Sequence, residues 1–194
     1  MNLPDNSINP TSTIPVEYTV VRPVEGKFLS GRNESVQDHG NLIQGFCTKC
    51  YLQHVVKDGK PVVNPKTKNP IILFCVMLEN PDKEIKYKVN FDIYSVTKLT
   101  SLLSGLNELE DYREDGNIPF ITLKLNSQTV DDTTYTYASV FVWDNGQWVK
   151  LKDGTRGENE SYKEYGIRLL DYWVNENQLV TDDIEYDLSD VEDW

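Results

Sequence analysis

The chain has 194 residues and a formal net charge of −12, and 39% of its residues are hydrophobic. This length suits one domain of ordinary size with terminal extensions. No apolar stretch approaches the roughly 20 residues that cross a bilayer. Because the first residues lack the basic and apolar parts of a signal peptide, we expect a soluble cytoplasmic protein. The three cysteines, an odd number, argue against a disulfide framework.

The charge is unevenly distributed. Residues 41–100 carry nine lysines against five acidic residues, whereas residues 101–180 carry seven basic and fourteen acidic residues. The last fourteen residues, 181–194, carry seven carboxylates and neither Lys nor Arg. One basic segment therefore lies inside an acidic protein. Local potential rather than total charge determines a binding groove, so the acidic pI does not exclude a nucleic-acid ligand.

The N-terminal part predicts a lead-in followed by a long strand. Residues 1–17 are rich in Pro, Asn, Ser and Thr and predict a flexible segment, and a short strand is expected over 18–21. The body of the domain is expected to begin near Asn41. A long strand over 42–56 ends at Asp58-Gly59, a dipeptide that favours a tight hairpin turn.

The middle of the chain predicts two strands and a helix. After a loop that holds two prolines, residues 71–78 form a continuous apolar run, as in a strand buried on both faces. Residues 84–94 alternate, with lysines facing opposite to the apolar side chains. Ser95 is placed as the N-cap of a helix over 96–109, where leucines recur at helical spacing.

The C-terminal half predicts three more strands and a closing helix. Strands are expected over 120–126 and 134–143, and Asn145-Gly146 turns into a short piece over 147–151. Residues 160–174 predict a helix. The order strand, strand, strand, helix, strand, strand is that of the oligonucleotide-binding (OB) barrel, a five-stranded Greek-key barrel.

The predicted fold is therefore mainly β, an OB-like five-stranded barrel with a helix between its third and fourth strands. We expect one such domain over residues 18–180, followed by a disordered acidic tail over 181–194. A different small β-rich domain with one helix is the alternative.

The candidate nucleic-acid site combines basic and aromatic residues, because an OB barrel binds a single strand in a positive groove with aromatic stacking faces. Lys86 and Lys88 lie on the polar side of the third predicted strand, with Tyr94 in phase, and Lys49 and Tyr51 share a face of the first. The expected contacts are Lys49, Tyr51, Lys57, Lys60, Lys66, Lys68, Lys86, Lys88 and Tyr94.

The fifth predicted strand has two faces of different character. Tyr135, Tyr137, Phe141 and Trp143 share one phase, opposite Ala138, Val140 and Val142. The smaller aliphatic set is the ordinary choice for a barrel interior, which would leave the aromatic set outside; the sequence leaves open which of the two faces is core. Such a set serves in a core or an interface more often than as a stacking platform.

The sequence Cys47-Thr48-Lys49-Cys50 with His54 has some features of a zinc knuckle, with Cys75 or His39 as possible fourth ligand. A structural zinc site takes four ligands in tetrahedral array, usually from two knuckles, and only one is present. In a regular strand Cys47 and Cys50 point to opposite faces, so we expect plain thiols and no metal. No catalytic motif or cofactor signature is present, and we expect no enzyme.

The tail, TDDIEYDLSDVEDW, places apolar residues among its acids and ends in an aromatic residue. A small β-rich body, a central basic stretch and such a tail together resemble the phage-encoded single-stranded-DNA-binding proteins of the podovirus replication type; bacterial single-strand-binding proteins carry a similar tip. This tail ends in Trp rather than Phe. The matching residues are Asp182, Asp183, Glu185, Asp187, Asp190, Glu192, Asp193 and Trp194.

The resemblance implies a function. Proteins of this kind coat single-stranded DNA during phage-type replication and recombination, in the host cytoplasm. Their tail recruits replication proteins, such as a polymerase or a helicase–primase, and competes with DNA for the groove. The alternative is a β-rich phage structural or host-takeover protein without affinity for single-stranded DNA, whose acidic surface imitates nucleic acid.

Overall fold

The computed structural model of the chain describes residues 17–65, 68–113, 116–130, 132–151 and 156–176. The expected acidic tail and all but the last residue of the expected lead-in lie outside these ranges. Neither described helix is long and apolar enough to cross a membrane.

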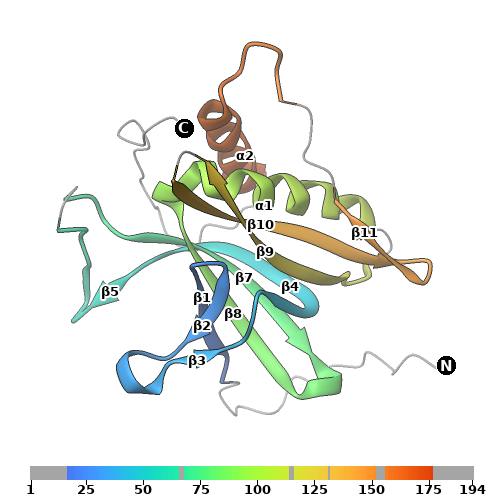
Figure 1. Cartoon of the computed structure of the whole chain (residues 1–194), viewed down its shortest axis with the longest axis horizontal. Coiled ribbons are helices and arrows are strands. Elements are labelled where there is room, and N and C mark those ends of the chain that lie inside the picture. Colours follow the sequence, from blue (N-terminus) through green and yellow to red (C-terminus); the bar gives the residue numbers. More distant parts are fainter. Residues whose placement is uncertain (1–16, 66–67, 114–115, 131, 152–155, 177–194) are drawn as a thin grey trace.

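The described residues form a nine-stranded mixed sheet and two α-helices, so the prediction of a mainly β fold with two helices is confirmed (Figure 1). The strand order is β11-β10-β9-β4-β7-β8-β1-β2-β3. The strands are β1 (Thr19–Val24), β2 (Lys27–Ser30), β3 (Gln37–Asp38), β4 (Leu42–His54), β7 (Ile72–Asn80), β8 (Ile85–Asp92), β9 (Phe120–Val130), β10 (Thr133–Asp144) and β11 (Gln147–Lys150).

The remaining elements are short, apart from the helices. A separate hairpin pairs β5 (Val56–Lys57) with β6 (Lys60–Pro61). The helices are α1 (Val96–Leu109) and α2 (Tyr162–Glu176), with 3-10 turns at η1 (Asn33–Ser35), η2 (Pro81–Lys83), η3 (Ile93–Ser95) and η4 (Glu110–Tyr112). Asp58 and Gly59 both have positive φ, as the predicted tight turn requires.

The prediction of a closed five-stranded barrel is wrong for the described residues. The five predicted strands correspond to β4, β7, β8, β9 and β10, and closure requires β8 to pair with β10. Instead β8 pairs with β1 in parallel and β10 pairs with β11, so the sheet is open. The body also begins earlier than Asn41, because β1, β2 and β3 extend the sheet beyond β8.

Strand β4 joins the two halves of the sheet. Its residues Leu42–Phe46 pair with β9, and Phe46–His54 pair with β7. The backbones of β4 and β7 approach closely there, because a Cβ on Gly45 would lie 2.9 Å from the backbone nitrogen of Glu79. The sheet curves around the side that holds the core (Figure 1).

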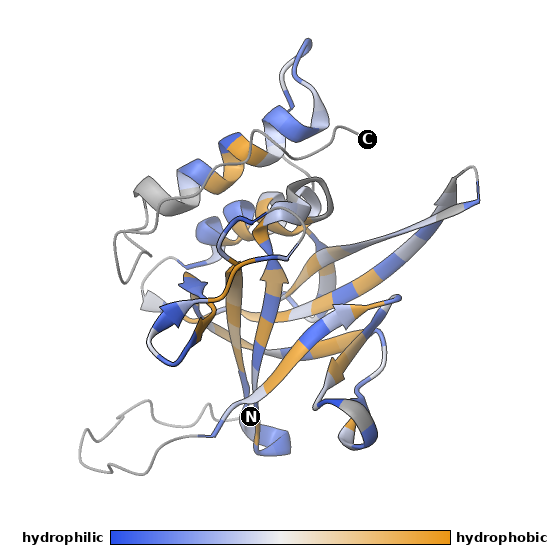
Figure 2. Ribbon diagram, turned by 90° about the vertical axis from the view of Figure 1, so that its left-hand side faces the viewer, coloured by the Kyte–Doolittle hydropathy of each residue, from blue (hydrophilic) through white to orange (hydrophobic). Residues whose placement is uncertain are grey.

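Helix α1 covers the concave side of the sheet, here called the inner face; the other side is the outer face. Leu102, Leu103 and Leu106 are fully buried, and a Cβ on Gly105 would lie 2.9 Å from the side chain of Val140 in β10. Apolar and polar bands alternate along the strands (Figure 2). Ser95 lies at the N-cap position, but its side chain makes no capping hydrogen bond.

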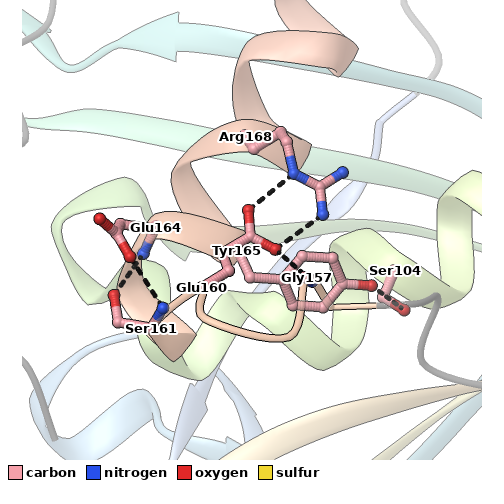
Figure 3. Close-up of polar contacts among 7 residues, drawn as sticks. All are labelled: Ser104, Gly157, Glu160, Ser161, Glu164, Tyr165 and Arg168. Carbon is pink, nitrogen blue, oxygen red and sulfur yellow. Dashed lines mark hydrogen bonds and ion pairs between the residues drawn. The ribbon is translucent and has the colours of Figure 1, made fainter.

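Helix α2 lies on α1, and its first turn is fixed by two polar contacts (Figure 3). Ser161 and Glu164 form a capping box, in which the Glu164 N–H donates to Ser161 Oγ (3.1 Å) and the Ser161 N–H to Glu164 Oε2 (2.8 Å). Arg168 donates hydrogen bonds to both carboxylate oxygens of Glu160, at 2.7 and 2.9 Å. These hydrogen bonds are the main reason that the pKa of Glu160 falls to about 2. Tyr165 donates to Ser104 of α1. Both helices therefore lie on the inner side.

A β-bulge divides β4. Cys47 is paired with Leu78 and Lys49 with Met77, so Thr48 is an extra residue without a partner in β7. A bulge shifts the alternation of side chains by one residue. Consequently Phe46, before the bulge, and Lys49 and Tyr51, after it, all lie on the outer face.

We predict that deletion of Thr48 is tolerated, whereas deletion of Val76 from β7 prevents cooperative folding. Removal of the extra residue leaves Phe46, Lys49 and Tyr51 outward, in the regular alternation of an uninterrupted strand. Strand β7, all of which is described, has no bulge, so a deletion within it exchanges the two faces of one of its halves and turns Glu79 into the core or Phe74 out of it. Urea unfolding followed by circular dichroism measures this.

The matched control is Thr48→Ala, which keeps the residue count and should unfold within about 1 kcal/mol of wild type, because the side chain is only partly buried. A Thr48 deletion that abolishes cooperative unfolding, or a Val76 deletion that unfolds like wild type, would contradict the role given to the bulge.

Candidate nucleic-acid interface

The outer face of the sheet is positively charged although the whole chain is acidic. Among the described strand residues it carries seven basic and three acidic side chains, a net charge of +4. The basic residues are Arg22, Lys27, Lys49, Lys86, Lys88, Lys124 and Lys150, and the acidic ones are Asp38, Glu79 and Asp92. Neither α1 nor α2 covers this face. The fold therefore separates a cationic surface from the acidic loops and helices.

The centre of this face is Tyr51 on β4. The ammonium of Lys49 lies 5.1 Å from the centre of its ring, and that of Lys88 on β8 lies 5.3 Å from it. Lys88 also donates a hydrogen bond to Gln53. Cation–π attraction holds both ammonium groups beside one partly buried aromatic ring. We call Lys49, Tyr51 and Lys88 the lysine–tyrosine cluster.

Lys86 lies on the same face but has a carboxylate partner. Its ammonium lies 2.8 Å from Glu79, and Tyr18 donates to the same carboxylate at 2.7 Å. Burial and then Glu79 raise the pKa of Tyr18 to about 12. Burial alone would raise the pKa of Glu79, but its hydrogen bonds with Lys86 and Tyr18 lower it overall. Lys86 therefore contributes less free positive charge than Lys49 or Lys88.

The predicted loop lysines lie between β4 and β7. Lys57 and Lys60 pair across the β5–β6 hairpin, and Lys68 has a positive φ of 63° in the next loop. Lys66 lies outside the described residues. In the sequence Lys57, Lys60 and Lys68 lie between β4 and β7, and the β5–β6 hairpin belongs to a separate two-stranded sheet.

The structure separates Tyr94 from the other predicted contacts. It lies in η3 rather than in β8, because the strand ends at Asp92 and the chain turns into α1. The ring is half-buried and packs against the core. Its expected place beside Lys86 and Lys88 on the polar side of the strand is therefore wrong.

The structure decides which face of β10 is core, a point that the sequence leaves open. Ala138, Val140 and Val142 are buried, and the aromatic set Tyr135, Tyr137, Phe141 and Trp143 lies outside. Sequence reasoning missed the neighbours of this set on other strands, namely Phe46, Phe120, Trp148, Lys124 and Lys150. The alternation of side chains over 120–126 could have identified Phe120 and Lys124 as outward-facing. Phe46 could not be assigned to the same face as Lys49 from the sequence, because the bulge between them shifts the alternation by one residue.

The two cysteines of the possible knuckle lie on the same face, not on opposite faces as expected. Their Sγ atoms are 3.9 Å apart in the core, because the bulge at Thr48 shifts the alternation between them. The Arg113 guanidinium donates a hydrogen bond to the Cys47 carbonyl at 3.2 Å. The pKa of the Cys47 thiol is lowered, mainly by a hydrogen bond from Cys50 and also by the nearby Arg113 charge. Within the described ranges, no three His, Cys, Asp or Glu residues gather as metal ligands would.

A cleft of about 1360 Å³ lies where closure of the barrel would join β8 to β10. The pairing of β1 with β8 ends at Val21 and Val89, and the strands then diverge. Charges of both signs line the cleft, Arg22 and Arg32 with Glu25 and Asp92. Since these charges balance, the outer face suits a polyanion better than the cleft does.

No protein-family model matches this chain, and no curated protein or solved structure matches it either. The case for a function therefore depends on the residues and their geometry.

Proposed function

We propose that this protein binds single-stranded DNA without strong sequence preference, through the outer face of β4, β7 and β8, in phage-type DNA replication or recombination. The observation that carries the proposal is the net charge of +4 on the whole outer face of the sheet, in a chain whose total charge is −12. Strands β4, β7 and β8 contribute Lys49, Lys86 and Lys88 against Glu79 and Asp92, and the neighbouring strands contribute the rest. The alternative of an acidic DNA mimic would need a negative surface, which this face does not offer.

The chemistry of the lysine–tyrosine cluster supports this ligand. Two ammonium groups about 5 Å from one ring place phosphate-binding charge beside an aromatic face. Stacking of a base on an aromatic side chain contributes roughly 1–3 kcal/mol and accepts every base. A flexible single strand can satisfy both contacts, because its bases are free to leave one another and stack on protein.

The strand order supports an OB-like ancestry for the body. The five predicted strands lie as β10-β9-β4-β7-β8, which is a five-stranded barrel opened between its two outermost strands. OB barrels are often partly open, and they bind single strands on the outer face of their strands and on adjoining loops. In chain order the five strands are β4, β7, β8, β9 and β10, and helix α1 lies between the third and the fourth, β8 and β9, as in that fold.

We expect oligo(dT) to bind at low salt with an affinity that falls steeply as salt is added, because bound lysines release counterions from phosphates. Each such contact on a single strand contributes about 0.7 to the slope of log affinity against log salt. Lys49→Gln with Lys88→Gln should therefore reduce the slope by about 1.4, as measured by fluorescence anisotropy.

The control is Lys163→Gln on α2, which removes one positive charge from the side of the helices and should leave the slope unchanged, whereas Lys49→Gln or Lys88→Gln alone should each reduce it by about 0.7. Absence of binding by the wild-type protein at micromolar concentration would sink the proposal. An equal loss in the control would remove the outer face as the binding surface.

We further propose that the acidic tail, outside the described residues, recruits replication proteins and competes with DNA for the outer face. Removal of residues 181–194 takes away seven carboxylates and should tighten oligo(dT) binding several-fold at low salt, and the difference should shrink as salt screens the charges. A full-length variant with all seven changed to Asn or Gln should behave like the truncation. Unchanged or weaker binding by both would remove the competition.

A further inference from the structure

A row of four aromatic rings crosses the outer face on β4, β9, β10 and β11. Phe46 is paired with Phe120 and Trp143 with Trp148, and Val142↔Ile121 places Trp143 next to Phe120. Successive ring centres are close, at 5.0 Å from Phe46 to Phe120, 6.1 Å from Phe120 to Trp148 and 5.2 Å from Trp148 to Trp143. We call these four residues the aromatic row.

The row is exposed at its outer end. Trp143 is 49% exposed and Trp148 is 39% exposed, whereas Phe46 and Phe120 are half-buried. Exposure of two large adjacent indole rings to water is unfavourable in free energy, and exposed apolar patches of this kind often mark a binding site. Packing of the described core does not account for them, because Val142 and Ile121 already fill the inner side of the same strands.

The charges around the row favour an anionic occupant. Lys150 is paired with Phe141, and Lys124 lies two residues beyond Thr122 on the outer face of β9. On β9, β10 and β11, no outward-facing side chain within the described residues is acidic. Flat apolar rings bordered by cations suit bases joined by phosphates.

The row is continuous with the lysine–tyrosine cluster. Phe46 ends the row on β4, and Lys49 and Tyr51 follow on the same face directly after the bulge. β4 and β11 are three strand spacings of about 4.8 Å apart, so the row is about 14 Å long. Stacked bases are about 3.4 Å apart, so the row is long enough to contact more than one base.

We propose that the aromatic row is a second stacking site for bases, and that a bound single strand runs from the lysine–tyrosine cluster across β9 and β10 to Trp148. This inference rests on the proposed function and names the path of the strand over the protein. The Lys124 and Lys150 ammonium groups contact phosphates along this path, while Trp143 and Trp148 stack on bases.

The test compares oligo(dT) of about 5 and about 16 nucleotides, which span the usual site sizes of OB folds. Trp143→Ala with Trp148→Ala should weaken binding of the longer oligonucleotide by at least about 5-fold, since one stacked base contributes about 1–3 kcal/mol and 1.4 kcal/mol is tenfold. The shorter one, which the lysine–tyrosine cluster can hold alone, should bind nearly as wild type. Trp143→Phe with Trp148→Phe should restore most of the affinity.

The matched control is Tyr172→Ala on α2, an aromatic ring 43% exposed on the side of the helices, which should leave both affinities unchanged. Urea unfolding of each variant checks that it is folded. If the alanine pair binds both oligonucleotides like wild type while Lys49→Gln with Lys88→Gln weakens binding, the row is no subsite and the proposed function stands. If neither the wild-type protein nor any variant binds either oligonucleotide, both the proposed function and the proposed second stacking site fail. If the alanine pair changes only the oligomeric state, the row is an interface between copies and the inference is overturned.

Discussion

The bulge that leaves Thr48 out of the pairing is the constraint on which the rest of the surface depends. A strand exposes every second side chain, so if Thr48 were paired regularly, Phe46 and Lys49, three residues apart, would point to opposite faces. The bulge places the aromatic row and the lysine–tyrosine cluster on one continuous surface. The same shift brings Cys47 and Cys50 together in the core, 3.9 Å apart, where Arg113 contacts Cys47.

One-sided coverage of the sheet turns an acidic sequence into a protein with a cationic face. Helix α1 packs its leucines on the inner face, and α2 packs on α1 with a hydrogen bond from Tyr165 to Ser104. Among the described residues, the loops and helices carry most of the carboxylates, and the outer face keeps seven basic residues against three acidic ones. Because a polyanion responds to local potential, the charge of this face matters more for binding than the total of −12.

The elements that sequence could predict are those determined locally. Alternation along β8 gave the outward lysines, alternation along β10 separated its aliphatic face from its aromatic one, and Asp58-Gly59 and Asn145-Gly146 gave the turns. Closure of the barrel was wrong, because the pairing of β8 with β1 brings together residues about 70 apart in the chain and has no local pattern. The bulge and the turn that takes Tyr94 out of the strand were missed for a related reason: each depends on a partner strand or a following helix. The functional residues on β9 and β11 became visible only when the register aligned them with Phe46.

The most direct measurement of the central claim is ultraviolet cross-linking of the full-length protein to oligo(dT), followed by mass spectrometry of the cross-linked peptides. The account predicts cross-links at Tyr51 and at aromatic residues of the row, such as Phe46 and Trp148, and none in α1 or α2. Cross-links confined to the helices, or to the cleft between β1 and β10, would contradict the assignment of the outer face as the nucleic-acid-binding surface.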